Sequence, residues 1–139
     1  MKVLIVDQNI NTRESLTLGL NNSKKEFAVF YANDGVDALS LLQEEVKIDL
    51  IISDLNLPRM GGISLLEILR KSKSTVSFIL FSSEAPEKLS QISKSLQLSG
   101  WFLKSFSSTM ELNTKDIIKR LEGFSDQLSA LKEYESLKS

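Results

Sequence analysis

Five short, continuous apolar runs recur along this 139-residue chain, and a segment with helical spacing follows each of them. Continuous rather than alternating apolar residues are typical of strands that are covered on both faces. In the segments between the runs, apolar residues recur at steps of three and four, as in amphipathic helices. The predicted strands are Val3 to Val6, Phe27 to Tyr31, Leu50 to Ile52, Phe78 to Phe81 and Trp101 to Leu103.

Strands that alternate with helices predict right-handed crossovers and an open parallel sheet with helices on both faces. We therefore predict an α/β fold of the doubly wound class. In this class, functional sites form outside the carboxyl ends of the strands, where the strand order reverses. The residues that end the strands are thus the first candidates for function.

Composition excludes several kinds of chemistry. The chain has no Cys and no His, which excludes disulfides, ordinary zinc sites, Ser-His-Asp hydrolysis and a phosphohistidine on this chain. Its 17 basic and 18 acidic residues argue against binding to nucleic acid by bulk charge. No apolar run reaches the ~20 residues of a membrane helix, so we expect a cytoplasmic protein without membrane contact.

Four side chains of complementary chemistry end the predicted strands: Asp7, Asp54, Ser82 and Lys104. Two neighbouring carboxylates raise each other's pKa, but a hard cation such as Mg²⁺ reverses that effect and leaves room for a phosphate ligand. The Lys104 ammonium and the Ser82 hydroxyl can each bond a phosphoryl oxygen. The set predicts an aspartate that accepts a phosphoryl group.

Each of these residues also has an ordinary structural interpretation. Asp7 and Asp54 precede predicted helices by a few residues and can be helix N-caps. Ser82 can bond a turn, Trp101 can simply pack on the sheet, and Lys104 can be a solvated amine. After Asp54, the sequence LNLPRMGG favours a tight turn that holds the aspartate on a rigid rim.

The ordered motifs LIVDQN, ANDGVDALSLLQ, DLIISDLNLPRMGG, FILFSSEA and SGWFLKS resemble the receiver domain of bacterial two-component response regulators over residues 2 to about 106. The resemblance implies a CheY-like, flavodoxin-like five-stranded sheet of order 2-1-3-4-5. It also implies Mg²⁺ as cofactor and the following roles: Asp54 as phosphoacceptor, Asp7 and the main-chain carbonyl of Asn56 as metal ligands, Ser82 and Trp101 as switch residues, and Lys104 as the family's lysine.

Three positions depart from the family pattern. Gln8 stands where the family usually has a second acid; its amide oxygen can bind Mg²⁺ or one of its waters, but we expect weaker metal binding. Ser105 replaces a proline whose peptide bond is typically cis, so the loop can turn differently and direct Lys104 away from Asp54. Leu96 and Gln97 replace Ala and Gly, so the fourth helix lacks a glycine cap and can end differently or run longer.

The last third of the chain predicts a further helix. Asn113 and Asp116 favour a helix start there. Apolar residues then step by four and three, with Gly123 as an interruption: Ile117, Leu121, Phe124, Leu128 and Leu131. We predict a receiver domain over residues 1–123 and a helical extension or the start of a linker over 124–139. The helix can pack on the domain, form a homodimer or lead to an output domain. No helix-turn-helix or basic patch follows, which argues against direct DNA binding.

Two functions follow from this reading. The first is a signalling module without ordinary enzyme activity, phosphorylated on Asp54 with Mg²⁺ by a sensor histidine kinase or a histidine phosphotransfer protein. It would signal to a downstream protein through the face formed by the fourth helix, the fifth strand and the fifth helix. The alternative is a receiver fold that has lost phosphotransfer and acts as an interaction or dimerisation domain through its C-terminal helix.

Overall fold

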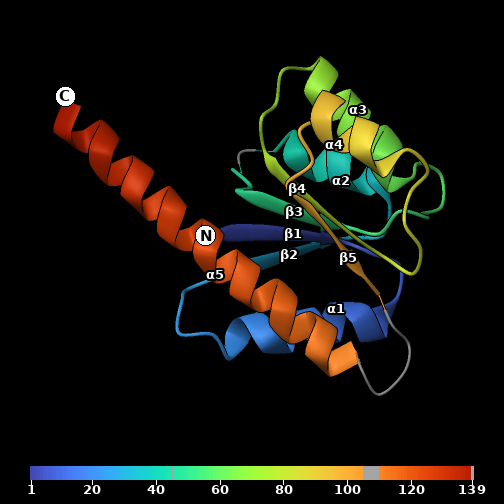
Figure 1. Ribbon diagram of the computed structural model, residues 1–139, viewed down its shortest axis with the longest axis horizontal. Coiled ribbons are helices and arrows are strands. Elements are labelled where there is room, and N and C mark those ends of the chain that lie inside the picture. Colours follow the sequence, from blue (N-terminus) through green and yellow to red (C-terminus); the bar gives the residue numbers. More distant parts are fainter. Residues whose placement is uncertain (45, 105–109, 139) are drawn as a thin grey trace.

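The computed structural model describes residues 1–44, 46–104 and 110–138, and strands and helices alternate throughout (Figure 1). The strands are β1 (Lys2–Val6), β2 (Ala28–Ala32), β3 (Leu50–Ser53), β4 (Ser77–Ser82) and β5 (Gly100–Leu103). The helices are α1 (Ile10–Asn21), α2 (Gly35–Leu42), α3 (Gly62–Lys71), α4 (Leu89–Ser95) and α5 (Met110–Lys138).

The five strands form one parallel sheet in the order β2-β1-β3-β4-β5. This order confirms the predicted doubly wound, flavodoxin-like fold. The chain starts in β1, moves outward to β2, and returns past β1 to β3. The strand order therefore reverses between β1 and β3, and the carboxyl ends of these two strands carry Asp7 and Asp54.

Helices cover both faces of the sheet and enclose two separate cores. Helices α1 and α5 lie on one face, while α2, α3 and α4 lie on the other (Figure 1). Alternate residues of β1 point into different cores: Val3 and Ile5 pack with Leu16 of α1, whereas Leu4 and Val6 pack with Leu65 of α3. A strand whose two faces pack into different cores is apolar at every position, which explains the continuous apolar run at the start of the sequence.

The edge strands differ from the central ones. Every residue of β3 is buried, and so is every residue of β1 after Lys2 and of β4 after Ser77. In β2 and β5, by contrast, most residues are only half-buried or exposed. Each edge strand still packs against both cores, through Val29 and Phe30 in β2 and through Phe102 and Trp101 in β5. The prediction of strands covered on both faces therefore holds fully for the three central strands and in part for the two edge strands.

Helix α4 ends without glycine. It spans only Leu89–Ser95, so it does not run longer than expected, and Gln97 itself adopts the left-handed conformation with φ 52°. The Arg70 guanidinium of α3 donates hydrogen bonds to the carbonyl oxygens of Leu96 at 2.7 Å and of Gln97 at 3.2 Å. The Leu98 N–H also donates to Ser93 O at 3.2 Å, which is the bond of a Schellman cap, so Gln97 takes the left-handed position that glycine usually occupies.

Helix α5 begins at Met110, so the predicted start at Asn113 was wrong by three residues. It runs without a break through Gly123 to Lys138. Ile117 and Leu121 are fully buried against the sheet and α1, whereas Leu131 is 51% exposed. The first half of α5 thus packs on the domain; a boundary at residue 123 stays a prediction. Among the described residues, no helix is both long enough and apolar enough to cross a membrane.

Candidate functional site

Three of the predicted site residues stand one position beyond the carboxyl ends of β1, β3 and β5. Each remains fixed to its neighbouring strand through its backbone N–H. Asp7 donates to Ala32 O at 3.1 Å, Asp54 to Val6 O at 2.9 Å, and Lys104 to Ser82 O at 2.6 Å. Because these bonds continue the sheet ladder, the sheet itself sets the position from which each side chain starts.

Lys104 joins the two acids. Its Nζ lies 2.7 Å from Asp7 Oδ2 and 2.9 Å from Asp54 Oδ2. The Lys104 and Asp7 side chains are 2% and 3% exposed, whereas 18% of the Asp54 side chain faces solvent. The lysine therefore does not point away from Asp54, as the loss of the following proline had suggested. Ser105 itself lies outside the described residues.

The Asp7 carboxylate is buried, and this burial raises its pKa above the ordinary value. The hydrogen bonds from Lys104 and from the Asn9 backbone N–H, together with the Lys104 charge, lower the pKa, but they do not outweigh desolvation. Asp7 is not the N-cap of α1, because Asn9 occupies that position and accepts from the N–H groups of Asn11 and Thr12. Burial of the Asp7 carboxylate costs free energy, and helix capping does not account for its position.

Asp54 starts a tight loop that folds back over its own side chain. Its Oδ1 accepts the backbone N–H of Leu55 at 2.7 Å and that of Asn56 at 3.4 Å. The N-cap of α3 is Gly61 rather than Asp54, so the capping interpretation was wrong for this residue as well. The Asn56 side-chain amide donates to Glu84 Oε1 at 3.4 Å, in the loop that follows β4.

Ser82 is fully buried and does not bond the acids in this conformation. Its hydroxyl donates to Glu84 O at 2.6 Å and accepts the indole N–H of Trp101 at 3.0 Å. A hydroxyl has a single proton to donate. Ser82 must therefore release Glu84 O before it can donate to a group on Asp54. The direct bond between Ser82 and Trp101 links the two residues that the family resemblance assigns to switching.

An ion-pair cluster that we did not predict from the sequence fixes the far end of the Asp54 loop. Arg59 Nε lies 2.6 Å from Asp34 Oδ2, and Arg59 Nη2 lies 2.8 Å from Asp37 Oδ1. The pKa of Asp34 is lowered, chiefly by the hydrogen bond from Arg59 and next by the Asp37 N–H. Arg59 adopts φ 60°, which favours glycine or asparagine. The sequence signal for this cluster is weak, because Arg59 is 25 residues from Asp34 and 22 from Asp37.

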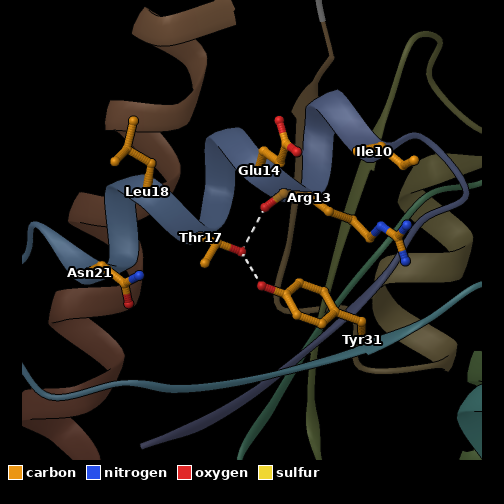
Figure 2. Close-up of a pocket in the computed structure, with 7 residues that line it drawn as sticks. All are labelled: Ile10, Arg13, Glu14, Thr17, Leu18, Asn21 and Tyr31. Atoms are coloured by element: carbon orange, nitrogen blue, oxygen red, sulfur yellow. Dashed lines mark hydrogen bonds between the residues drawn. The ribbon is translucent and has the colours of Figure 1, made fainter.

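An open groove of about 500 Å³ runs along the outer face of α1 beside the edge strand β2 (Figure 2). The Thr17 hydroxyl lies 2.6 Å from the Tyr31 hydroxyl and donates to Arg13 O at 2.7 Å. Ile10 and Leu18, at opposite ends of the groove, are 59% and 63% exposed. The groove contains no member of the Asp7, Asp54 and Lys104 cluster.

The donor set fits a magnesium ion. Each carboxylate oxygen of Asp7 and Asp54 has two lone pairs, so the bonds to Lys104 and to backbone N–H groups leave acceptor capacity on both acids. Mg²⁺ binds through one or two carboxylates, a phosphate and several waters, and does not require a complete protein cage. In the described parts of the chain, no group of three or more acids gathers at one point. Gln8 is exposed beside this pair.

Residues 3–115 match the family model of the response regulator receiver domain. The chain belongs to the response-regulator receiver family. It is 30% identical over 129 residues to the chemotaxis protein CheY-3 of Vibrio cholerae, which covers 87% of this chain and 94% of CheY-3. The phosphorylated cyanobacterial phytochrome response regulator RcpA is 26% identical, with a TM-score of 0.72, over 84% of this chain and 89% of RcpA.

Other receiver relatives are longer proteins. A probable transcriptional regulatory protein of Picosynechococcus is 28% identical over 62% of this chain, but the match covers only 36% of that protein. The chain thus spans about a third of that relative. Receiver domains are generally signalling modules without enzyme activity of their own, they typically bind Mg²⁺, and they interact with histidine kinases and downstream effectors.

The opposite pKa shifts of Asp7 and Asp34 predict opposite pH dependences. Because the Asp7 pKa is raised in the folded state, its ionisation destabilises the fold; we expect Asp7→Asn to gain stability relative to the parent as pH rises from about 3 to 7. Because the Asp34 pKa is lowered, its ionised form stabilises the fold, and Asp34→Asn should lose stability relative to the parent over the same range. Thermal melts of the three proteins across this range provide the measurement. If the stability of all three proteins changed equally with pH, the argument from burial would be contradicted.

Proposed function

We propose that this receiver domain accepts a phosphoryl group on Asp54 from a phosphohistidine partner. An Asp54 oxygen forms the new P–O bond as the P–N bond of the donor breaks, and the released imidazole nitrogen keeps the electron pair. The observation that carries this proposal is the Lys104 ammonium, which bonds Asp7 and Asp54 at once while Asp54 alone remains partly open to solvent. Positioning and charge neutralisation are what phosphoryl transfer needs most.

The residues around Asp54 would have separate roles in the proposed phosphoryl transfer. Lys104 offers a positive charge to a phosphoryl oxygen on Asp54. Asp7, Asp54 and the Asn56 carbonyl would hold Mg²⁺, which neutralises phosphoryl charge when bound; Gln8 contributes an amide in place of an acid. Ser82 would exchange its bond to Glu84 O for a bond to the phosphoryl group, and this exchange would change its contact with Trp101. Such a switch acts by population shift.

The test is phosphorylation by a small-molecule phosphodonor in the presence of Mg²⁺, followed by intact-mass measurement. We expect one phosphate adduct on the parent chain and none on Asp54→Ala. Asp49→Ala is the matched control, because Asp49 precedes the same strand β3 at its other end and accepts a hydrogen bond from the Lys2 N–H. An adduct on Asp54→Ala, or none on the parent at any Mg²⁺ concentration, would refute the assignment.

Partners follow from the same proposal. The phosphodonor is a sensor histidine kinase or a histidine phosphotransfer protein, which must approach the carboxyl edge of the sheet where Asp54 is accessible. The output partner would bind the face formed by α4, β5 and α5, which includes Trp101. A homodimer through α5 is also part of this proposal, because the C-terminal half of α5 exposes apolar side chains. The convergence of Lys104, Asp7 and Asp54 supports phosphotransfer over an interaction domain that has lost it.

A further inference from the structure

Arg59 has a strained backbone conformation in the loop that begins at the proposed phosphoacceptor. Its φ of 60° lies in the left-handed region, which long side chains rarely adopt. Residues in such conformations persist where the surrounding structure fixes them, and they cluster at functional sites. Arg59 follows Asp54 by five residues in the same loop. The contacts that fix Arg59 therefore bear on the position of Asp54.

The Arg59 guanidinium binds both oxygens of one buried acid. Its Nε donates to Asp34 Oδ2 at 2.6 Å, and its Nη2 donates to Asp34 Oδ1 at 3.1 Å. Nη2 also donates to Asp37 Oδ1 at 2.8 Å. The Asp34 side chain is only 4% exposed, and it caps helix α2 by accepting the Asp37 N–H. Arg59 thus binds a carboxylate that is itself fixed, in the two-bond geometry that suits a planar guanidinium.

The next residue, Met60, binds the same turn through its backbone. Its carbonyl oxygen accepts the Gly35 N–H at 3.1 Å. A Cβ at position 35 would lie 2.9 Å from this oxygen, so the two loops can approach this closely because residue 35 is glycine. Two consecutive residues of the Asp54 loop therefore contact the start of α2.

At its other end, the same loop orients the Asp54 carboxylate. Asp54 Oδ1 accepts the Leu55 N–H at 2.7 Å and the Asn56 N–H at 3.4 Å. The Leu55 carbonyl oxygen accepts the Gly62 N–H at 3.0 Å, where α3 begins. Because these bonds join the two ends of one short loop, a shift at Arg59 would move the N–H groups that hold the carboxylate.

We propose that Arg59 is a positioning residue for phosphoryl transfer to Asp54. Its contacts with the start of α2 hold the loop so that the Leu55 and Asn56 N–H groups orient the Asp54 carboxylate. Arg59 acts through the loop backbone and does not touch the reacting atoms, because its guanidinium bonds the two acids of α2. The inference rests on the proposed function and adds a residue to it.

Arg59→Gly removes the guanidinium with little risk to the fold. Glycine adopts φ 60° without strain, which offsets part of the stability lost with the ion pairs. Lys73→Gly is the matched control, because it removes the same charge from an exposed residue with φ 66° that follows α3 at its other end. Urea denaturation verifies that both variants are folded under the conditions of the assays.

Amide hydrogen exchange measures the loop without phosphate or metal. In Arg59→Gly, we expect the Leu55 and Asn56 amides to exchange at least about tenfold faster than in the parent, because the loop opens more often. In Lys73→Gly, the same amides should exchange at the parent rates. Unchanged exchange in Arg59→Gly would show that the loop keeps its position without the arginine, and would overturn the inference.

The rate of phosphorylation measures the consequence for the reaction. The donor is phosphoramidate, which carries a P–N bond as phosphohistidine does, with saturating Mg²⁺. We expect Arg59→Gly to be labelled about tenfold more slowly than the parent, and Lys73→Gly at the parent rate. Arg59→Lys should also be slow, because an ammonium group cannot make the paired bonds of a guanidinium. A parent-like rate for Arg59→Lys would mean that charge alone suffices, and would contradict the positioning role.

Asp34→Asn tests whether Arg59 acts through this acid. Asparagine can still cap α2, but it lacks the charge that pairs with Arg59. We expect slower labelling of Asp34→Asn and little further loss when Arg59→Gly is added, because both changes break the same contact. Fully independent effects would overturn the inference. Absence of label on the parent would refute the proposed function itself, whereas equal labelling of the parent and Arg59→Gly would refute only the role of Arg59.

Discussion

Gln8→Asp is expected to tighten Mg²⁺ binding at least about tenfold, which corresponds to about 1.4 kcal/mol. The substitution adds a third carboxylate beside Asp7 and Asp54; within the described ranges, no three acids gather in the parent chain. One added charge at ~4 Å interacts with a unit positive charge by about 4 kcal/mol at an effective dielectric of 20. Desolvation and ionic screening reduce that figure, so tenfold is the expected lower bound. Isothermal titration with Mg²⁺ measures the affinities of both proteins.

The control variant for this prediction carries the same change in charge at a position away from the site. Gln91→Asp on the exposed side of α4 alters net charge equally but leaves the Asp7 and Asp54 pair untouched. We expect its Mg²⁺ affinity to equal that of the parent. Equal affinities of Gln8→Asp and the parent would show that residue 8 does not face the metal. Tighter binding by both variants would indicate a general effect of charge.

The same substitution also predicts a change in stability. A third acid would add like-charge repulsion to Asp7, whose pKa burial already raises. In the absence of metal, Gln8→Asp should therefore be less stable than the parent, and saturating Mg²⁺ should reverse the order. Urea denaturation of both proteins with and without Mg²⁺ measures the two orders of stability.

The central fold was predictable because its signal is strong in each strand. Each residue from Val3 to Val6 contributes to one of two cores, so the sequence must be apolar throughout. The edge strands were less predictable, because β2 contains the same kind of run although Tyr31 is 44% exposed. Apolar content alone does not separate a central strand from an edge strand.

The residues of the site could be predicted from the sequence, but only part of their geometry could. Parallel strands bring their carboxyl ends to one edge, so the meeting of Asp7, Asp54 and Lys104 follows from topology. The hydrogen bonds of Ser82 depend on the local turn to Glu84 and on the rotamer of Trp101, which no spacing rule fixes. The Arg59 cluster was missed because its partners, Asp34 and Asp37, are distant in sequence.

Two helical glycines in different surroundings give the second large effect: Gly62→Ala should strongly destabilise the domain, whereas Gly123→Ala should stabilise it. An added Cβ at Gly62 would collide with the Asp54 carbonyl oxygen and crowd the Ser53 hydroxyl at 3.1 Å. The collision involves backbone, which cannot rotate away. Such overpacking typically costs about 1–3 kcal/mol and occasionally more. At Gly123, nothing lies within 4 Å of an added Cβ.

The same two variants also distinguish an effect on stability from an effect on the geometry of the site. Gly123→Ala replaces a helix-interior glycine, which should raise the free energy of unfolding by up to about 1 kcal/mol without altering phosphorylation. The Gly62→Ala collision displaces the Asp54 backbone, so phosphorylation should fall even under conditions where the variant remains folded. Urea denaturation and phosphodonor labelling of both variants measure the two effects. Normal labelling of folded Gly62→Ala would mean that the loop relaxes around the new methyl group and that Asp54 does not depend on this close approach.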